Sequence, residues 1–277
     1  MEIKSLSKLL GVEVSGVDLK KDNDNNVKKK LNKLFIESSV LVIRNQNLDP
    51  NEFYKSAEIF GEIFKQHNSR FSLKENTKVH YISNKDKFED GKIYIPGEGF
   101  HTDHSNDLTP PKATILHAKK IPSYGGDTQF VNMNKVFESF KNDQKKYFLK
   151  LKATHVYQSK YSKRKLFKLA NNDPNSTKKV IHPIVRTHPE TGLKSLYINP
   201  IRIENIEGES EENMRKLIKN IMIKVKSKKF EYRHKWRKGD FVIWDNRILM
   251  HKANGDYDMS EDRYLYRIML KGDRPYL

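Results

Sequence analysis

Short runs of β-branched and aromatic residues, each too short for a typical helix, set the first limit on the fold of this chain. They lie at residues 12–17, 40–44, 230–236, 241–244 and 264–270. Val, Ile, Phe, Tyr and Trp are favoured on strands because their side chains pack well on a pleated surface. Since strand-like runs dominate the C-terminal third, the sequence predicts a mainly β protein.

A smaller number of helices is expected beside these strands. Apolar residues recur at helical spacing over 27–35, and residues 49–52 read as the cap, first-turn proline and capping acid of a second helix running toward Phe60. A further helix is predicted from Asn134 to about Leu151. Another carries an apolar stripe over 214–225, which we interpret as core packing. The expected class is α+β, with strands dominant and helices flanking them.

The chain of 277 residues contains no internal repeat and no low-complexity linker. We therefore predict one domain over residues 1–277, long enough to bury a sizeable core. Residues 62–100 look irregular and end in the turn-forming Pro96-Gly97-Glu98-Gly99. Long irregular connections are often active-site lids, so a lid is one interpretation of this segment and a mobile surface loop is the other.

The chain has no cysteine. This excludes disulfides, thiolate zinc sites, iron–sulfur clusters and cysteine nucleophiles together, so any metal must be bound by His, Asp or Glu. The N-terminal residues lack the apolar core of a signal peptide, and no apolar run approaches the roughly 18 residues of a membrane span. We expect a cytoplasmic protein without a membrane partner.

The formal net charge is +18. Basic surfaces bind phosphate backbones through counterion release, so a nucleic-acid-associated function is an alternative to be weighed. Most of the charge is lysine, as in Lys28-Lys29-Lys30, without interleaved arginines and stacking aromatics. We favour a solvated surface with no nucleic-acid partner, whose positive field would draw small anions toward a cleft.

A histidine and an aspartate stand two residues apart in His101-Thr102-Asp103. On an extended strand both side chains leave the same face and can converge on one ion. Short His-x-Asp matches also occur by chance, and a surface hydrogen bond is the common alternative. Farther along, a strand-like segment that ends in the apolar Ile248-Leu249-Met250 delivers a second histidine, His251. Two His and one carboxylate form a facial triad that leaves adjacent positions open on iron, whereas zinc prefers a closed tetrahedron.

Two arginines, Arg263 and Arg267, follow the second histidine and lie four residues apart. In a strand both point to the same side, roughly 13 Å apart at strand rise. The planar guanidinium pairs bidentately with a carboxylate or sulfonate, so each arginine could bind one anion. Without the triad upstream, two exposed arginines on a solvent-facing strand would be the simpler interpretation.

Ordered motifs along nearly the whole chain resemble the taurine dioxygenase and 2,4-dichlorophenoxyacetate dioxygenase (TauD/TfdA) family of Fe(II)/2-oxoglutarate enzymes. These motifs are residues 11–19, Phe60-Gly61-Glu62, His101-Thr102-Asp103, Pro110-Pro111, Gly125-Gly126-Asp127-Thr128, residues 182–189, Trp244-Asp245-Asn246-Arg247, His251 and Gly272-Asp273. The resemblance implies a distorted jelly roll, the clavaminate synthase-like double-stranded β-helix, flanked by helices.

The resemblance also implies roles for individual residues. His101, Asp103 and His251 match the iron ligands of the family, and Thr128 and Arg263 match the pair that binds the distal carboxylate of 2-oxoglutarate. The implied cofactor is Fe(II), and the implied cosubstrates are 2-oxoglutarate and O2. The implied reaction hydroxylates a C–H bond and releases succinate and CO2.

The substrate side of the resemblance rests on Arg267, which matches the sulfonate-binding arginine. Residues 63–68 and 97–100 depart from taurine dioxygenases where the amino-sulfonate is recognised, so taurine itself is not expected. We expect a small anionic organic substrate whose oxidised C–H lies near a sulfonate, sulfate ester, aryloxy-carboxylate or phosphonate group. A nucleobase oxygenase that uses the basic surface is a further alternative.

Three other histidines are not expected to bind iron. His104 should leave the opposite strand face from Asp103, and His182 and His188 lie in a connection rich in Pro and Arg. The sequence leaves the oligomeric state open, with a homodimer or a homotetramer as alternatives to a monomer.

Overall fold

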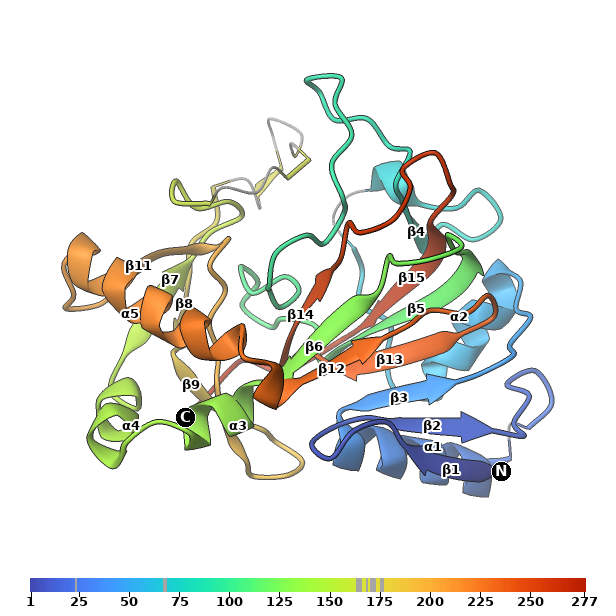
Figure 1. Ribbon diagram of the computed structural model, residues 1–277, viewed down its shortest axis with the longest axis horizontal. Coiled ribbons are helices and arrows are strands. Elements are labelled where there is room, and N and C mark those ends of the chain that lie inside the picture. The colour runs from blue at the N-terminus through green and yellow to red at the C-terminus, as the bar shows by residue number, and fades with distance from the viewer. Residues whose placement is uncertain (23, 67–68, 163–165, 168, 170–172, 175–176) are drawn as a thin grey trace.

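Two packed β-sheets form the centre of this computed structural model (Figure 1). The structure describes residues 1–22, 24–66, 69–162, 166–167, 169, 173–174 and 177–277. The larger sheet has seven strands, in the order β1 (Glu2–Ser5), β2 (Val12–Ser15), β3 (Val40–Ile43), β13 (Phe241–Asp245), β5 (Ala113–Lys120), β15 (Tyr264–Leu270) and β4 (His80–Ser83). The smaller sheet has three strands, β12 (Glu231–His234), β6 (Thr128–Asn132) and β14 (Leu249–Ala253). The mainly β, jelly-roll-like prediction is confirmed.

Neighbouring strands in the two sheets are antiparallel except β2 and β3, which pair in parallel. The central strands β3 and β13 are buried on both faces, and their apolar residues alternate between two cores. Leu41 and Ile243 point into the core beneath the N-terminal helices. Val42 and Trp244 point into the core between the two sheets, where they meet Phe130 of the smaller sheet.

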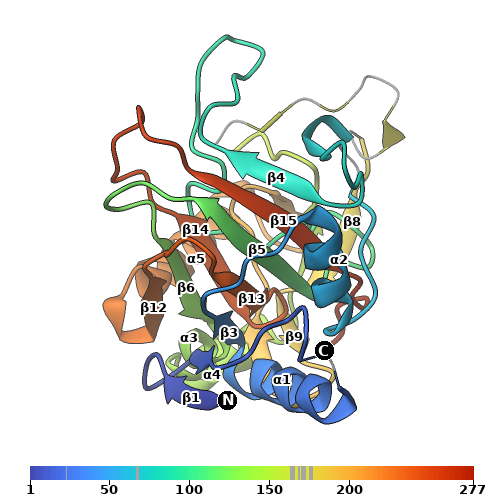
Figure 2. The same ribbon diagram turned by 90° about the vertical axis from the view of Figure 1, so that its right-hand side faces the viewer.

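Helices α1 (Asn25–Ser38) and α2 (Pro50–Glu58) cover the outer face of the larger sheet (Figure 2). The predicted start of α2 is confirmed, because Asp49 and Glu52 form a reciprocal capping box around Pro50. The helix ends two residues short of Phe60, which packs edge-on against Phe35 of α1 at 6.1 Å between ring centroids.

A third core lies outside the smaller sheet, under helices α3 (Met133–Glu138), α4 (Asn142–Phe148) and α5 (Glu211–Val225). The apolar stripe on α5 is confirmed as core packing, with Met214, Ile221 and Val225 buried. The short strands β7 (Lys152–His155), β8 (Val180–Pro183), β9 (Val185–Thr187), β10 (Lys194–Leu196) and β11 (Ile203–Ile206) complete this region. Among the described residues, no helix is long and apolar enough to cross a membrane.

The single helix predicted from Asn134 to about Leu151 is wrong, because α3 and α4 are separate helices. The break lies at Ser139, whose hydroxyl donates to the Val136 carbonyl at 2.7 Å and so competes with helix continuation. The chain then turns Phe140 inward, where it packs edge-on against Phe148 at 5.0 Å between ring centroids. Burial of Phe140 therefore compensates for the interrupted helix.

The irregular interpretation of residues 62–100 is wrong for residues 80–83, which form β4 at the edge of the larger sheet, paired with β15. The run escapes a pattern-based prediction because it is only four residues long and is flanked by polar connections. His67 and Asn68, part of the expected departure from taurine dioxygenases, lie outside the described residues. The lid and the single domain over 1–277 remain predictions.

A buried ion pair holds the turn between β13 and β14. Both oxygens of Asp245 accept hydrogen bonds from Arg247, whose Nη2 lies 2.6 Å from Oδ2, and His188 Nε2 lies 3.0 Å from the same oxygen. Burial alone would raise the pKa of Asp245, but Arg247 and His188 hold that pKa well below its ordinary value. The motif residues 244–247 therefore fix the turn that leads into the strand carrying His251.

We predict that Asp245→Asn lowers the free energy of unfolding by about 3 kcal/mol at pH 7, because it removes the buried charge partner of Arg247 and leaves only the exposed Glu190 paired with it. Since the pKa of Asp245 is depressed in the folded protein, its contribution is present above the unfolded value of about 3.9 and is lost as the pH falls below it. Urea unfolding at pH 7 and near pH 3 checks this. Asp262→Asn, at an exposed pair with Lys120, is the control and should change little. Equal stability of the Asp245→Asn variant and wild type at pH 7 would contradict the assignment.

Candidate metal centre and active site

Two distant segments meet through backbone pairing at the predicted metal ligands. His251 lies on β14, and His101 ends a loop that forms an isolated antiparallel bridge with it. The N–H of each histidine donates to the carbonyl of the other, at 2.9 Å from His101 and 2.8 Å from His251. This pairing brings the two imidazole rings to 4.3 Å between centroids.

Asp103 joins the two histidines from a turn. The predicted extended strand through His101-Thr102-Asp103 is wrong, because only His101 is in a β-bridge and the chain turns immediately afterwards. The turn is held by Thr102, whose hydroxyl donates to the Asn246 carbonyl at 2.9 Å and whose carbonyl accepts from Asn199 at 2.8 Å. One ligand atom from each of His101, Asp103 and His251 nevertheless lies within 4.8 Å of the others. The structure therefore brings together the three residues that the sequence singles out.

The chemistry of this group fits a divalent metal. His101 Nδ1 lies 2.9 Å from the Gly99 carbonyl, and because a carbonyl only accepts, Nδ1 carries the proton and Nε2 keeps its lone pair. That Nε2 lies 3.9 Å from Asp103 Oδ1, and His251 Nε2 lies 3.7 Å from Asp103 Oδ2. All three side chains are buried. Two imidazoles and one carboxylate on one side of a cavity leave positions open for other ligands.

Asp103 is ionised in this setting. Burial alone would raise its pKa, but the positive charge of Arg267 and the electrostatic effect of the nearby histidines hold the pKa of Asp103 well below its usual range. Arg267 Nη2 lies 3.0 Å from Oδ1, and the Thr114 hydroxyl donates to Oδ2 at 2.6 Å. Thr114 lies on β5, a strand for which the sequence offered no clear pattern, so this partner was missed.

His104, His182 and His188 are not part of the His101, Asp103 and His251 group. His104 has a left-handed backbone (φ 45°) and points to Asp107 at 3.5 Å. His182 Nε2 donates to the Asp107 carbonyl at 2.9 Å, and His188 belongs to the Asp245 cluster. His104 still lines the cavity beside Asp103.

One half of the cavity, beside His251, is lined by Thr128 and Arg263. Arg263 is only 3% exposed, and its Nε donates to the Gly126 carbonyl at 2.9 Å. Gly126 has a positive φ of 67°, and a Cβ there would lie 3.2 Å from Arg263 Cδ. The Thr128 hydroxyl accepts from Trp236 Nε1 at 3.0 Å. A guanidinium and a hydroxyl therefore lie in the same buried half.

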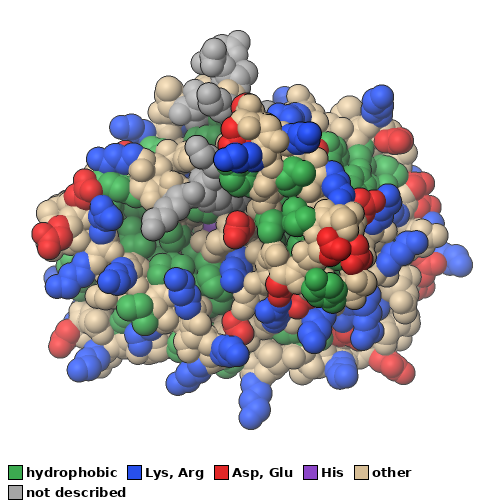
Figure 3. Space-filling view, turned by 45° about the horizontal axis from the view of Figure 1, so that its top comes forward, with side chains coloured by type: hydrophobic (Ala, Val, Ile, Leu, Met, Phe, Trp, Pro, Cys, Tyr) green, Lys and Arg blue, Asp and Glu red, His purple; other side chains and the backbone are tan. Residues whose placement is uncertain are grey.

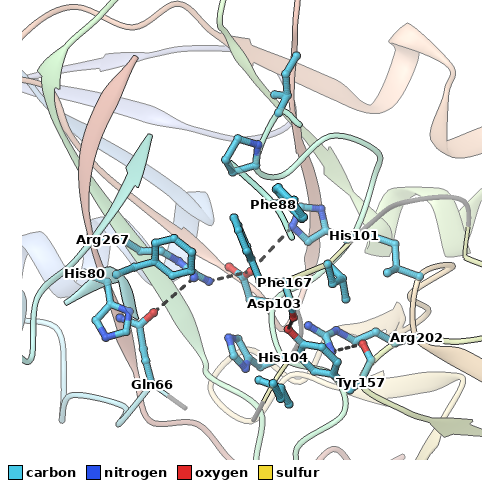
Figure 4. Close-up of a pocket in the computed structure, with 16 residues that line it drawn as sticks. Gln66, His80, Phe88, His101, Asp103, His104, Tyr157, Phe167, Arg202 and Arg267 are labelled. Atoms are coloured by element: carbon cyan, nitrogen blue, oxygen red, sulfur yellow. Dashed lines mark hydrogen bonds and ion pairs between the residues drawn. The ribbon is translucent and has the colours of Figure 1, made fainter. Parts of the chain in front are cut away.

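The other half of the cavity contains Arg267 (Figure 4). Arg267 lies on β15 with its guanidinium between Asp103 and Gln66, whose Oε1 is 3.4 Å away. Arg263 immediately precedes this strand, and both arginines line the half beside His251 as well. The expectation that they point to the same side is confirmed. Burial, then the charge of Arg267, lowers the pKa of His80 in this half to about 4.

Aromatic side chains form much of the remaining wall of this half, a feature that the sequence did not reveal. Phe88 stacks on Phe167 at 3.7 Å between centroids, and Phe71 lies 4.8 Å from the Phe167 ring. They come from separate segments that no spacing rule connects. On the face shown in Figure 3, hydrophobic side chains surround the hollow, whereas lysines and arginines are scattered among acidic residues.

Comparisons with known proteins agree with this site. The profile of the family described as taurine catabolism dioxygenase TauD, TfdA matches residues 2–269. The alpha-ketoglutarate-dependent 2,4-dichlorophenoxyacetate dioxygenase of Cupriavidus pinatubonensis is 28% identical over 283 residues, covering 95% of this chain and 94% of that protein. The alkylsulfatase of Acinetobacter baylyi is 29% identical over 285 residues, covering 99% of this chain and 86% of that protein.

A solved structure is similar over the same length. The crystal structure of a taurine dioxygenase from Burkholderia xenovorans has a TM-score of 0.82 at 29% identity, covering 99% of this chain and 92% of that chain. The fold, the His–Asp–His group and the family match therefore lead to one conclusion. The chain belongs to the taurine catabolism dioxygenase TauD, TfdA family, as its motifs predict, and is an Fe(II)- and 2-oxoglutarate-dependent dioxygenase.

Proposed function

We propose that this enzyme hydroxylates a C–H bond near the anionic group of a small organic acid. The acid is a sulfonate, sulfate ester, aryloxy-carboxylate or phosphonate, and 2-oxoglutarate and O2 are converted to succinate and CO2 in the same reaction. One observation carries the proposal: Arg263 and Arg267 line one cavity together with the His101, Asp103 and His251 group. The relatives support the substrate class, since one is named for an aryloxyacetate and another for alkyl sulfates.

His101, Asp103 and His251 would hold Fe(II), which supplies the oxidising chemistry when bound. In the buried half, Arg263 and Thr128 bind the distal carboxylate of 2-oxoglutarate. Arg263 suits this role because its guanidinium is fixed through the Gly126 carbonyl and shielded from water. Around the metal position, the buried walls exclude water and keep the cosubstrate in one orientation.

Arg267 binds the anionic group of the substrate. Its only ion-pair partner among the described residues is Asp103, which Fe(II) would neutralise, so the guanidinium becomes available for a substrate anion. Fe(II), Arg263 and Arg267 together carry a surplus of three positive charges over Asp103. The two carboxylates of 2-oxoglutarate and one substrate anion balance that surplus, which explains why a neutral substrate is unfavourable.

We predict that His101→Ala, Asp103→Ala and His251→Ala each abolish stoichiometric Fe(II) binding and turnover, while far-UV circular dichroism stays as in wild type. Each change removes one of three metal ligands. Metal content after anaerobic loading is the direct measurement, and Asp262→Ala, which removes an exposed carboxylate, is the control. Wild-type Fe(II) binding and activity in Asp103→Ala would contradict the assignment.

Substitutions of Arg263 and Arg267 should weaken the binding of different ligands. Arg263→Ala is expected to weaken 2-oxoglutarate binding at least about tenfold, and Thr128→Ala less, because the carboxylate loses charge-assisted or neutral partners. Arg267→Ala should spare 2-oxoglutarate binding, measured anaerobically by its absorption band on Fe(II), and impair substrate-coupled turnover. If Arg267→Ala loses that band and keeps its substrate affinity, the two arginines have the opposite roles to those proposed.

Thr114 should act on the metal through Asp103. Thr114→Val keeps the side-chain shape but removes the hydrogen bond to Asp103 Oδ2, so we expect metal affinity to fall by about ten- to a hundredfold. Competition with a metal chelator measures it. Thr187→Val, on β9 outside the cavity, is the matched control. Equal affinities in the two variants would show that Thr114 does not orient the carboxylate.

A further inference from the structure

A third arginine, Arg202, lines the half of the cavity that contains Arg267 (Figure 4). It lies immediately before β11 and reaches the cavity beside Tyr157. In Figure 4, Arg202 and Arg267 approach from different sides, and Asp103 lies between them. A substrate that spans the two guanidinium groups would therefore pass beside the metal ligands.

Neutral groups hold Arg202 in place. Nη1 donates to the Tyr157 carbonyl at 2.6 Å, and the guanidinium carbon lies 5.2 Å from the centroid of the Tyr157 ring. The Tyr157 hydroxyl in turn donates to the Phe167 carbonyl at 2.7 Å. Among the described residues, no hydrogen bond or ion pair involves Nε or Nη2 of Arg202. The orientation is therefore set while two donor atoms have no acceptor among the described residues.

Within the part of the chain that the structure describes, no carboxylate is paired with Arg202. None of the described acidic groups lies within 4.0 Å of it. Asp103 pairs with Arg267 at 3.0 Å, and Asp107 pairs with Lys178 at 3.5 Å. Burial lowers the pKa of Arg202, since the partly buried guanidinium is removed from water without full compensation. Such a group is costly unless a ligand supplies the opposite charge.

We propose that Arg202 binds a second anionic group of the substrate, so that the preferred substrate is an organic dianion whose acidic groups lie on both sides of the oxidised carbon. This inference rests on the proposed function, in which Arg267 binds the first anionic group. Arg202 adds one positive charge to the surplus that 2-oxoglutarate and a monoanionic substrate balance. A carboxylate at the far end of the substrate removes that excess.

The wall between the two arginines indicates what joins the acidic groups. Phe167 lies 4.8 Å from Phe71 and 3.7 Å from Phe88 between ring centroids, and all three side chains line the half of the cavity that contains both arginines. They favour a short apolar or aromatic spacer. The same arrangement explains why taurine is a poor candidate, because its ammonium group would face Arg202.

The test uses two series of three compounds. The first series is phenylmethanesulfonate that carries a carboxylate, a carboxamide or an aminomethyl group in the para position. The second series has two carbons between the end groups and consists of 3-sulfopropanoate, its amide and taurine. Binding is measured by calorimetry on the Mn(II)- and 2-oxoglutarate-loaded protein, and turnover by succinate formation with Fe(II). In at least one of the two series, we expect the carboxylate compound to bind about tenfold more tightly than the carboxamide compound. The ammonium compound should bind most weakly.

Variants of Arg202 test whether this residue causes the difference in affinity between the compounds. Arg202→Gln should weaken binding of the carboxylate compound about tenfold and change the carboxamide compound little, Arg202→Lys should restore part of the loss, and Arg202→Glu should favour the ammonium compound. Arg237→Gln, an exposed arginine outside the cavity, is the control and should resemble wild type. If the enzyme turns over the carboxylate and carboxamide compounds and binds them with equal affinity, the inference is overturned and the proposed function stands. Failure of all six compounds to bind or react would overturn both.

Discussion

The pair of backbone hydrogen bonds between His101 and His251 is the contact on which the active site depends. It joins the end of a long loop to β14 and sets the imidazole rings 4.3 Å apart. Because backbone atoms make this contact, the loop sequence before His101 can vary while the ligands keep their approach. The buried Asp245 and Arg247 pair fixes the turn that starts β14. The positions of His101 and His251 therefore follow from backbone pairing, whereas Asp103 is placed by the turn after His101.

The positive charge of three arginines that line the cavity is the second constraint. Arg263 lies in the buried half, where the residue is 3% exposed. Arg267 and Arg202 line the half with the aromatic wall. A guanidinium that is partly removed from water favours an anion in place of solvent. We infer that the depth of each arginine decides its ligand, with the cosubstrate in the buried half and the substrate in the aromatic half.

Sequence patterns predicted those features that depend on local spacing or on family motifs. Examples are strands β3, β13 and β15, the cap of α2, and the group of His101, Asp103 and His251. The interrupted helix at Ser139 was missed because the inward turn of Phe140 depends on tertiary packing. Thr114 and Arg202 were missed for a related reason. Each comes from an element that carries no motif, and only the folded chain places it beside Asp103 or in the cavity.

A crystal structure of the protein grown anaerobically with Mn(II) and 2-oxoglutarate tests the central claim most directly. We expect the metal to bind His101 Nε2, one oxygen of Asp103 and His251 Nε2, and the distal carboxylate of 2-oxoglutarate to contact Arg263 and Thr128. Arg267 should remain free of 2-oxoglutarate. A metal bound by other residues, or a 2-oxoglutarate carboxylate paired with Arg267, would contradict the division of the cavity into a cosubstrate half and a substrate half.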